Sequence, residues 1–186
     1  VIRGEMPSKG LNGLIENLRK SKKPLFIIGG SGWTDRSCSK LHNFINENNI
    51  PVATSFRRQD LFDHKNENFA GSFGTSVSPK LINSTKNSDL IVVLGARLGE
   101  MTTQGYSIIN PQDISKNIMH IHVDPNELNK VFNANVCINV GVNECCDKLE
   151  ELTLDNSNRW KEWRNELNKN YLEDSKPQKN LSLIHI

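Results

Sequence analysis

The chain has 186 residues, of which 36% are hydrophobic and 24% are charged, and its formal net charge is +2. This composition fits one globular domain with a buried core and excludes an intrinsically disordered chain. Basic residues are interspersed with acidic ones, so nothing indicates a nucleic-acid partner. No apolar run approaches the roughly 18 residues that cross a bilayer, and the first residues lack the apolar centre of a signal peptide. We therefore expect a cytoplasmic protein without a membrane partner.

The first predicted unit is a helix, followed by a strand, a glycine turn and a second helix. Ser8 is placed to cap the first helix, and Pro24 ends it. Residues 25–28 form a buried apolar strand, and the turn Gly29-Gly-Ser-Gly32 leads to a helix that opens at Asp35. This order of elements is typical of a parallel sheet.

The middle of the chain continues the same alternation. Residues 50–54 form a second predicted strand, and residues 57–74 form an irregular segment long enough to indicate a functional loop. A helix from Pro79 precedes the buried strand 90–94, which ends in the turn Gly95-Ala-Arg97.

Two further strands and two helices complete the prediction. Residues 117–124 and 135–140 have the pattern of strands, residues 142–152 that of a helix, and residues 157–172 that of an amphipathic helix. The alternation predicts an α/β, Rossmann-like three-layer domain with a mostly parallel sheet and right-handed crossovers.

Three strand ends carry candidate ligand-binding residues. The turn 29–32 either presents backbone N–H groups to a phosphate or is a plain turn that needs glycine for steric reasons. Arg97 either binds a phosphate or stacks on adenine, or it pairs with Asp89 or Glu100. Asp124 either accepts hydrogen bonds from ribose hydroxyls or caps the turn that starts at Pro125.

No motif for catalysis or metal binding is recognised. The sequence has no nucleophile elbow, no Walker loop, and no Gly-Asp-Gly followed at a distance by Asn for a magnesium diphosphate. His120 and His122 share one face of a strand but have no third ligand, so we predict neither a metal site nor a catalytic residue. The four cysteines have no zinc or disulfide spacing and are interpreted as packing residues.

Five segments between Ser8 and Leu152 stand in a familiar order: Pro24-Leu-Phe-Ile-Ile-Gly-Gly-Ser-Gly32, Pro51-Val-Ala-Thr-Ser55, Ala70-Gly-Ser-Phe-Gly74, Ser88-Asp-Leu-Ile-Val-Val-Leu-Gly-Ala-Arg97 and Ile121-His-Val-Asp-Pro-Asn-Glu-Leu128. Together they resemble the central domain of thiamine-diphosphate-dependent enzymes of the acetolactate synthase and 2-oxo acid decarboxylase superfamily. The resemblance implies a sheet of about six strands, of the DHS-like NAD/FAD-binding type.

The resemblance also implies a larger parent enzyme. Residues 8–152 would be its central domain, residues 153–172 a C-terminal helix leading to the missing next domain, and residues 173–186 a linker or disordered tail. The missing pyrimidine-binding and diphosphate-binding domains would hold thiamine diphosphate and Mg. The parent, a homodimer or homotetramer, would decarboxylate 2-oxo acids or transfer acyl units from them, while this chain alone would lack the catalytic residues.

In this family the central domain binds FAD in acetolactate-synthase-like members, and ADP or CoA in others. Mapped onto this sequence, and with Asp124 added from its strand-end position, the contacts fall on Gly29, Gly30, Ser31, Thr54, Ser55, Phe56, Gly71, Ser72, Phe73, Gly95, Ala96, Arg97, His122, Val123 and Asp124. The segment Gly95-Ala-Arg-Leu-Gly-Glu-Met101 stands where synthases show Gly-x-Arg-Phe-Asp-Asp-Arg. Two other readings are a nucleotide-binding regulatory module for ADP, FAD or CoA, and a purely structural spacer domain.

Overall fold

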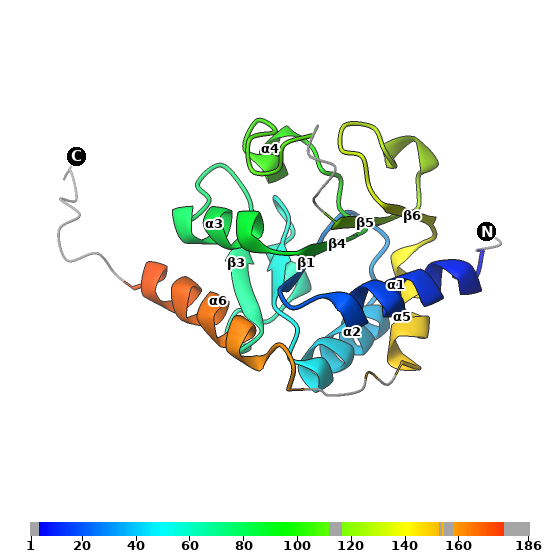
Figure 1. Cartoon of the computed structure of the whole chain (residues 1–186), viewed down its shortest axis with the longest axis horizontal. Coiled ribbons are helices and arrows are strands. Elements are labelled where there is room, and N and C mark those ends of the chain that lie inside the picture. The colour runs from blue at the N-terminus through cyan, green and yellow to red at the C-terminus, as the bar shows by residue number, and fades with distance from the viewer. Residues whose placement is uncertain (1–3, 112–116, 153, 155–157, 177–186) are drawn as a thin grey trace.

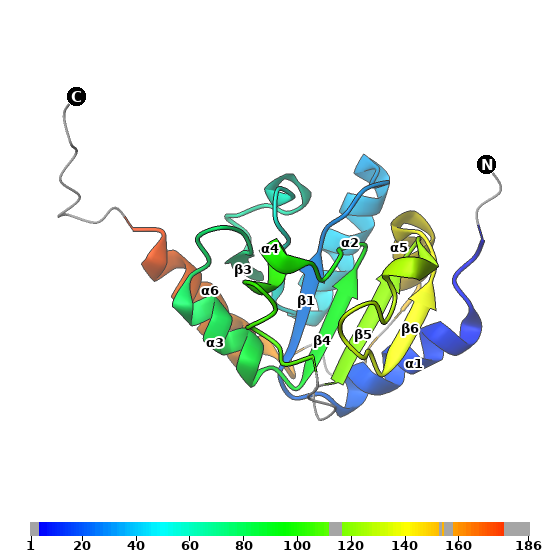
Figure 2. The same cartoon turned by 90° about the horizontal axis from the view of Figure 1, so that it is seen from above.

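Six parallel strands form one sheet in the order β3-β2-β1-β4-β5-β6. The computed structural model describes residues 4–111, 117–152, 154 and 158–176. Figure 2 shows β1, β4, β5 and β6 side by side and pointing the same way. The strands are β1 (Pro24–Ile28), β2 (Val52–Thr54), β3 (Phe69–Ser72), β4 (Leu90–Leu94), β5 (Asn117–His122) and β6 (Val136–Asn139). The predicted α/β fold with a six-stranded parallel sheet is confirmed.

Helices cover both faces of the sheet and give a three-layer domain (Figure 1). The first, second and fifth helices pack on one face, and the third and sixth on the other. None of the helices in the described ranges is long and apolar enough to cross a membrane. The helices are α1 (Ser8–Lys20), α2 (Asp35–Asn48), α3 (Pro79–Asn87), α4 (Glu100–Thr103), α5 (Val142–Glu150) and α6 (Lys161–Asp174), with short 3-10 turns η1 (Gln59–Leu61) and η2 (Pro125–Glu127).

The two central strands explain why the core has two halves. Every residue of β1 and β4 is buried, because helices lie on both sides of the sheet. Successive side chains point to opposite faces, so Phe26 and Ile28 join the core under α1, α2 and α5, whereas Leu25 and Ile27 join the core under α3 and α6. The unbroken apolar runs seen in the sequence are the result of this two-sided burial.

The prediction that residues 57–74 are irregular throughout was wrong, because the segment contains β3. The strand pairs with β2 through Val52 and Phe69 and then shifts register. At Gly71 the backbone has a φ of 123°, a conformation that favours glycine. A four-residue strand with an internal glycine has no period-2 pattern, so it depends on tertiary packing.

Two local predictions about helices also need correction. Pro7, not Ser8, is the N-cap of α1, and no side chain caps that helix. Ser8 is already the first helical residue, so its hydroxyl is not in the capping position. The four-residue helix α4 was not predicted from the sequence, because it is too short to show a helical period.

The last helix packs back along the domain. The indole N–H groups of Trp160 and Trp163 donate to the carbonyl oxygens of Ser21 and Pro24, at 3.0 and 2.9 Å. Asn168 Nδ2 donates to the Phe69 carbonyl at 2.9 Å, so α6 also protects the edge strand β3. The helix continues to Asp174, beyond the predicted end at residue 172, while residues 157 and 177–186 of the predicted helix and tail lie outside the described residues.

Candidate functional site

A large cleft lies at the point where the strand order reverses. From β1 the chain continues outward to β2 and β3, and then returns to place β4 on the other side of β1. The carboxyl ends of β1 and β4 therefore leave a crevice between the loops that follow them, which is where open α/β sheets bind ligands. A cleft of about 1130 Å³ occupies this position, large enough for a small-molecule ligand.

Eight of the predicted contact residues line this cleft, and seven do not. Phe73 is buried, Thr54 is buried and hydrogen-bonds to Ser72, and Gly71 and Ser72 line a separate cavity of about 160 Å³ beside α3 and α6. The lining residues among the predicted set are Gly30, Ser31, Ser55, Phe56, Gly95, Arg97, His122 and Val123. The others are Gly29, Thr54, Gly71, Ser72, Phe73, Ala96 and Asp124.

Glycines at the floor of the cleft allow two loops to touch. A Cβ on Gly30 would lie 1.8 Å from the carbonyl oxygen of Gly95, and Gly30 also has a φ of 71°. A Cβ on Gly95 would lie 2.5 Å from Val142 Cγ1. Both positions require glycine for contacts within the protein, so the steric reading of the 29–32 turn has a physical basis whether or not a ligand binds.

The loop after β1 is held by hydrogen bonds to its carbonyl groups. Trp33 Nε1 donates to the Gly29 carbonyl at 2.8 Å, and Asn143 Nδ2 of α5 donates to the Gly32 carbonyl at 2.8 Å. Within the described ranges, the backbone N–H groups of residues 30–32 have no hydrogen-bond partner. These donors are at the cleft wall and are available to an anionic ligand.

Among the described residues that line the cleft, Arg97 is the basic side chain that forms no ion pair with a carboxylate. By contrast, Arg58 forms a two-point ion pair with Asp60 at 3.0 Å, and Lys130 lies 2.9 Å from Glu127. Glu100 and Glu144 add negative charge to the lining. An anionic group in this cleft therefore has one free guanidinium with which to pair.

The ion pair proposed for Arg97 with Asp89 is not formed, because Asp89 lies at the other end of β4. Its carboxylate accepts hydrogen bonds from Ser21 Oγ and from the backbone N–H groups of Lys22 and Lys23, at 2.5, 2.7 and 2.9 Å. No pair between Arg97 and Glu100 is formed either in the part of the chain that the structure describes. Asp89 instead fixes the turn between α1 and β1.

Two histidines stand at the end of β5 in different roles. His120 is buried, and its Nε2 lies 2.9 Å from the Ala96 carbonyl oxygen, so this nitrogen donates; burial lowers the pKa of His120. Nδ1 of His122 lies 3.0 Å from the backbone nitrogen of Asp124 and 3.1 Å from the Asp124 carbonyl oxygen. His122 brings its imidazole ring to the cleft lining.

Asp124 caps the turn η2, as one of its two predicted roles required. Its Oδ1 accepts from both the backbone and the side-chain N–H of Asn126, each at 2.9 Å, and these bonds lower the pKa of the Asp124 carboxyl. Its carboxylate does not line the cleft.

Several lining residues were not found from the sequence. Met101 and Tyr106 come from the segment after β4, and Val131 and Phe132 come from the connection between β5 and β6. The only hint in the sequence was their position shortly after strand ends, because neither segment shows a period or a motif.

Comparison with known proteins identifies the family. Residues 11–149 match the family described as "Thiamine pyrophosphate enzyme, central domain". The acetolactate synthase large subunit of Haemophilus influenzae is 26% identical over 116 residues, which are 62% of this chain and 20% of that protein. The isozyme 3 large subunit of Escherichia coli is 24% identical over 138 residues, 74% of this chain and 24% of its own length.

A relative with a different printed activity matches equally well. Sulfoacetaldehyde acetyltransferase of Alcaligenes xylosoxydans is 26% identical over 139 residues, covering 75% of this chain and 23% of that protein. The chain thus spans about a fifth to a quarter of the length of these relatives. The predicted resemblance is confirmed: the chain belongs to the family of thiamine pyrophosphate enzyme central domains.

Proposed function

We propose that this chain is the non-catalytic central domain of a thiamine-diphosphate-dependent lyase or transferase, and that its cleft binds a nucleotide such as ADP or FAD. The parent enzyme decarboxylates a 2-oxo acid or transfers its acyl unit. The observation that carries the nucleotide role is the pairing, in one cleft, of the free Arg97 guanidinium with the free N–H groups of residues 30–32. Both are suited to phosphate oxygens.

Further side chains that line the cleft, besides the charged Arg97, are suited to bind a nucleotide. Ser55 and Phe56 follow β2 beside the phosphate-binding groups, and His122 adds its imidazole ring from the end of β5. The site is therefore polar near β1 and β4, and a ligand that extends from it meets donors from three strand ends. FAD or ADP would supply the phosphates that these donors are placed to bind.

The two adjacent cysteines of α5 are unsuited to act as nucleophiles. Within the described residues no three His, Cys, Asp or Glu side chains gather in a way that could hold a metal ion. Cys145 and Cys146 are buried in α5; burial raises the pKa of Cys145 to about 12 and also raises the pKa of Cys146. Neither thiol forms the thiolate that a nucleophile requires.

The rest of the parent supplies the reaction under this proposal. Thiamine diphosphate, bound with Mg by the pyrimidine-binding and diphosphate-binding domains, provides the carbanion chemistry. The central domain contributes the nucleotide site and the surfaces that hold its neighbours, within a homodimer or homotetramer. The relatives' printed activities, acetolactate synthase and sulfoacetaldehyde acetyltransferase, both support an acyl-transfer reaction.

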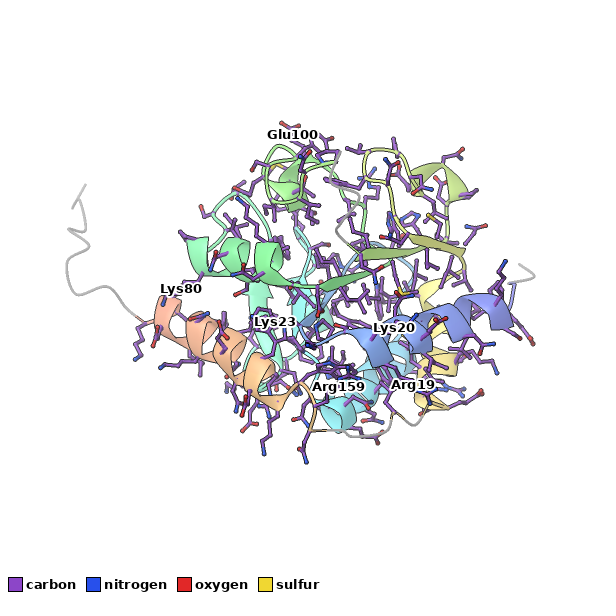
Figure 3. The ribbon with its side chains drawn as sticks, viewed as in Figure 1. Arg19, Lys20, Lys23, Lys80, Glu100 and Arg159 are labelled. Carbon is purple, nitrogen blue, oxygen red and sulfur yellow. The ribbon has the colours of Figure 1, made fainter. Side chains whose placement is uncertain are left out.

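Calorimetric titration of the 186-residue chain with ADP, FAD, CoA and NAD tests the nucleotide role. Micromolar binding of at least one of them is expected, with a loss of about tenfold or more in Arg97→Ala, because hydrogen bonds to charged groups contribute about 1.5–3 kcal/mol. Lys20→Ala is the matched control: it removes one positive charge from an exposed ion pair on α1, and Figure 3 shows Lys20 far from Glu100 and α4. Silence with all four ligands would leave the domain as a structural spacer.

A further inference from the structure

Exposed apolar side chains gather in the cleft. In the described part of the chain, five large apolar side chains are exposed, and four of them line this one site. They are Met101, Tyr106, Val123 and Val131, with exposures of 38, 39, 64 and 40%, while the fifth, Leu172, lies on α6. Such concentration on one surface marks a place where apolar groups bind. We call these four residues, with the buried Phe132 behind them, the apolar wall.

The apolar wall is formed where two separate segments meet. Met101 and Tyr106 belong to α4 and the turn after it, and Val123, Val131 and Phe132 belong to the β5–β6 connection. The rings of Tyr106 and Phe132 are tilted by 46° with centroids 6.1 Å apart. In Figure 1 both segments rise above the sheet, on the opposite side from α1, α2 and α5. The wall therefore faces the same cleft as Arg97 and the 30–32 loop.

Tyr106 occupies a backbone conformation that its residue type disfavours. Gln104, Gly105 and Tyr106 form a left-handed run with φ of 52, 63 and 64°. Among the described non-glycine residues with positive φ, two are asparagines, which tolerate this region, whereas an aromatic side chain seldom adopts it. Such outliers persist where the surroundings fix them, and they cluster at binding sites.

The turn that holds Tyr106 is fixed by several hydrogen bonds. The Tyr106 N–H donates to Thr103 Oγ1 at 3.2 Å, and the Ser107 and Ile108 N–H groups donate to the Thr103 carbonyl at 3.0 and 3.2 Å. Gln104 Nε2 donates to the Gly74 carbonyl, which ties the turn to the loop after β3. The backbone position from which the exposed ring extends is thus held by the protein's own hydrogen bonds.

From this arrangement we infer that the ring of Tyr106 is the stacking platform for the aromatic base of the bound nucleotide. The inference rests on the proposed function, because it assumes that the phosphates of the nucleotide bind to Arg97 and the 30–32 loop. The base of the same nucleotide then binds to the apolar wall. A flat apolar ring joined to phosphates matches a cleft with one apolar half and one half of free donors. Tyr106 is a binding residue for the base, because every base has a flat face that can stack on an aromatic ring.

A comparison of ADP with inorganic diphosphate separates the two halves of the cleft. Tyr106→Ala weakens ADP binding by roughly five- to hundredfold, as base–aromatic stacking predicts, and leaves diphosphate binding unchanged. Tyr106→Phe keeps the ring and binds ADP as the unsubstituted chain does. Arg97→Ala weakens both ligands. Thermal melting confirms that each variant is folded, and Tyr106→Gly melts at a higher temperature than Tyr106→Ala, because glycine accepts the left-handed backbone.

Three outcomes overturn the inference, and they can be told apart. If no nucleotide and no diphosphate binds the unsubstituted chain, the proposed function fails and the stacking role fails with it. If ADP binds equally well to Tyr106→Ala, the nucleotide site stands but Tyr106 does not read the base. If Tyr106→Ala instead abolishes a self-association seen by sedimentation and leaves ADP binding intact, the apolar wall is an interface between copies of this chain.

Discussion

Substitution of Gly30 by alanine tests whether the two loops at the floor of the cleft touch as the structure shows. The new Cβ would lie 1.8 Å from the Gly95 carbonyl oxygen, a backbone atom that cannot turn aside. The left-handed φ of 71° costs about 1–2 kcal/mol for a non-glycine residue, and displacement of the Gly95 loop adds about 1–3 kcal/mol. Gly30→Ala should therefore lower the free energy of unfolding by about 2–5 kcal/mol.

Two other glycines serve as graded controls for this substitution. Gly32 has a φ of 87° but open space around its missing Cβ, so Gly32→Ala should cost only about 1–2 kcal/mol. Gly99 has both open space and a φ of −85°, so Gly99→Ala should change stability by less than about 0.5 kcal/mol. The series thus separates the clash from the backbone cost.

Urea unfolding followed by far-ultraviolet circular dichroism measures all three variants. An unchanged slope with denaturant shows that the midpoints report stability rather than a change in the unfolded chain. The expected order of destabilisation is Gly30→Ala, then Gly32→Ala, then Gly99→Ala, without any ligand present. If Gly30→Ala is no more destabilising than Gly32→Ala, the contact between the two loops is refuted.

Three further predictions concern the buried side chains. Trp163→Ala should lower the free energy of unfolding in urea by about 3–5 kcal/mol, since Trp163 is 6% exposed and its indole donates to the Pro24 carbonyl. If Trp163→Ala destabilises the chain less than Trp163→Phe does, this packing is contradicted. Burial lowers the pKa of His120 below its ordinary 6.5, so the unfolded chain binds a proton at His120 more readily than the folded chain does. The free energy of unfolding should therefore fall as the pH drops below about 6.5, and His120→Gln should flatten this dependence on pH. Cys145 and Cys146, whose pKa values burial raises, should stay unreacted with a thiol reagent at pH 8 until urea unfolds the chain, and rapid labelling of either would count against their burial.

The central strands could be predicted from the sequence because local pattern and tertiary burial agree there. The run from Leu90 to Leu94 is apolar throughout, and the strand is buried on both faces. At β3 the local pattern and the tertiary burial disagree. Phe69-Ala-Gly-Ser forms a strand only because it pairs with β2 and because α6 packs against it. Elements whose stability comes from distant neighbours carry too little local information to be recognised.

The position of the cleft could be predicted from the sequence, but the full set of residues that line it could not. Parallel strands end at one edge, so residues that follow β1, β2, β4 and β5 had to lie near one another, and Gly30, Ser55, Arg97 and His122 do. The mapping failed to bring Gly71 to Phe73 into the cleft because β3 lies two strands from the reversal point. The sequence predicts which residues lie at the carboxyl edge of the sheet. The order of the strands in the sheet decides which of these residues share a cleft.

The apolar wall shows why the remaining part of the site needed a structure. Tyr106 and Val131 lie in two segments without period, and each segment alone exposes only two large apolar residues, which is ordinary for a protein surface. The wall exists because the turn after α4, held in its left-handed conformation, meets the β5–β6 connection above the sheet. The segment Gly95-Ala-Arg-Leu-Gly-Glu-Met101 leads into that turn. Tyr106 lies in this turn and Arg97 lies just before α4, so Tyr106→Ala and Arg97→Ala, made separately, distinguish base recognition from phosphate binding in the proposed site.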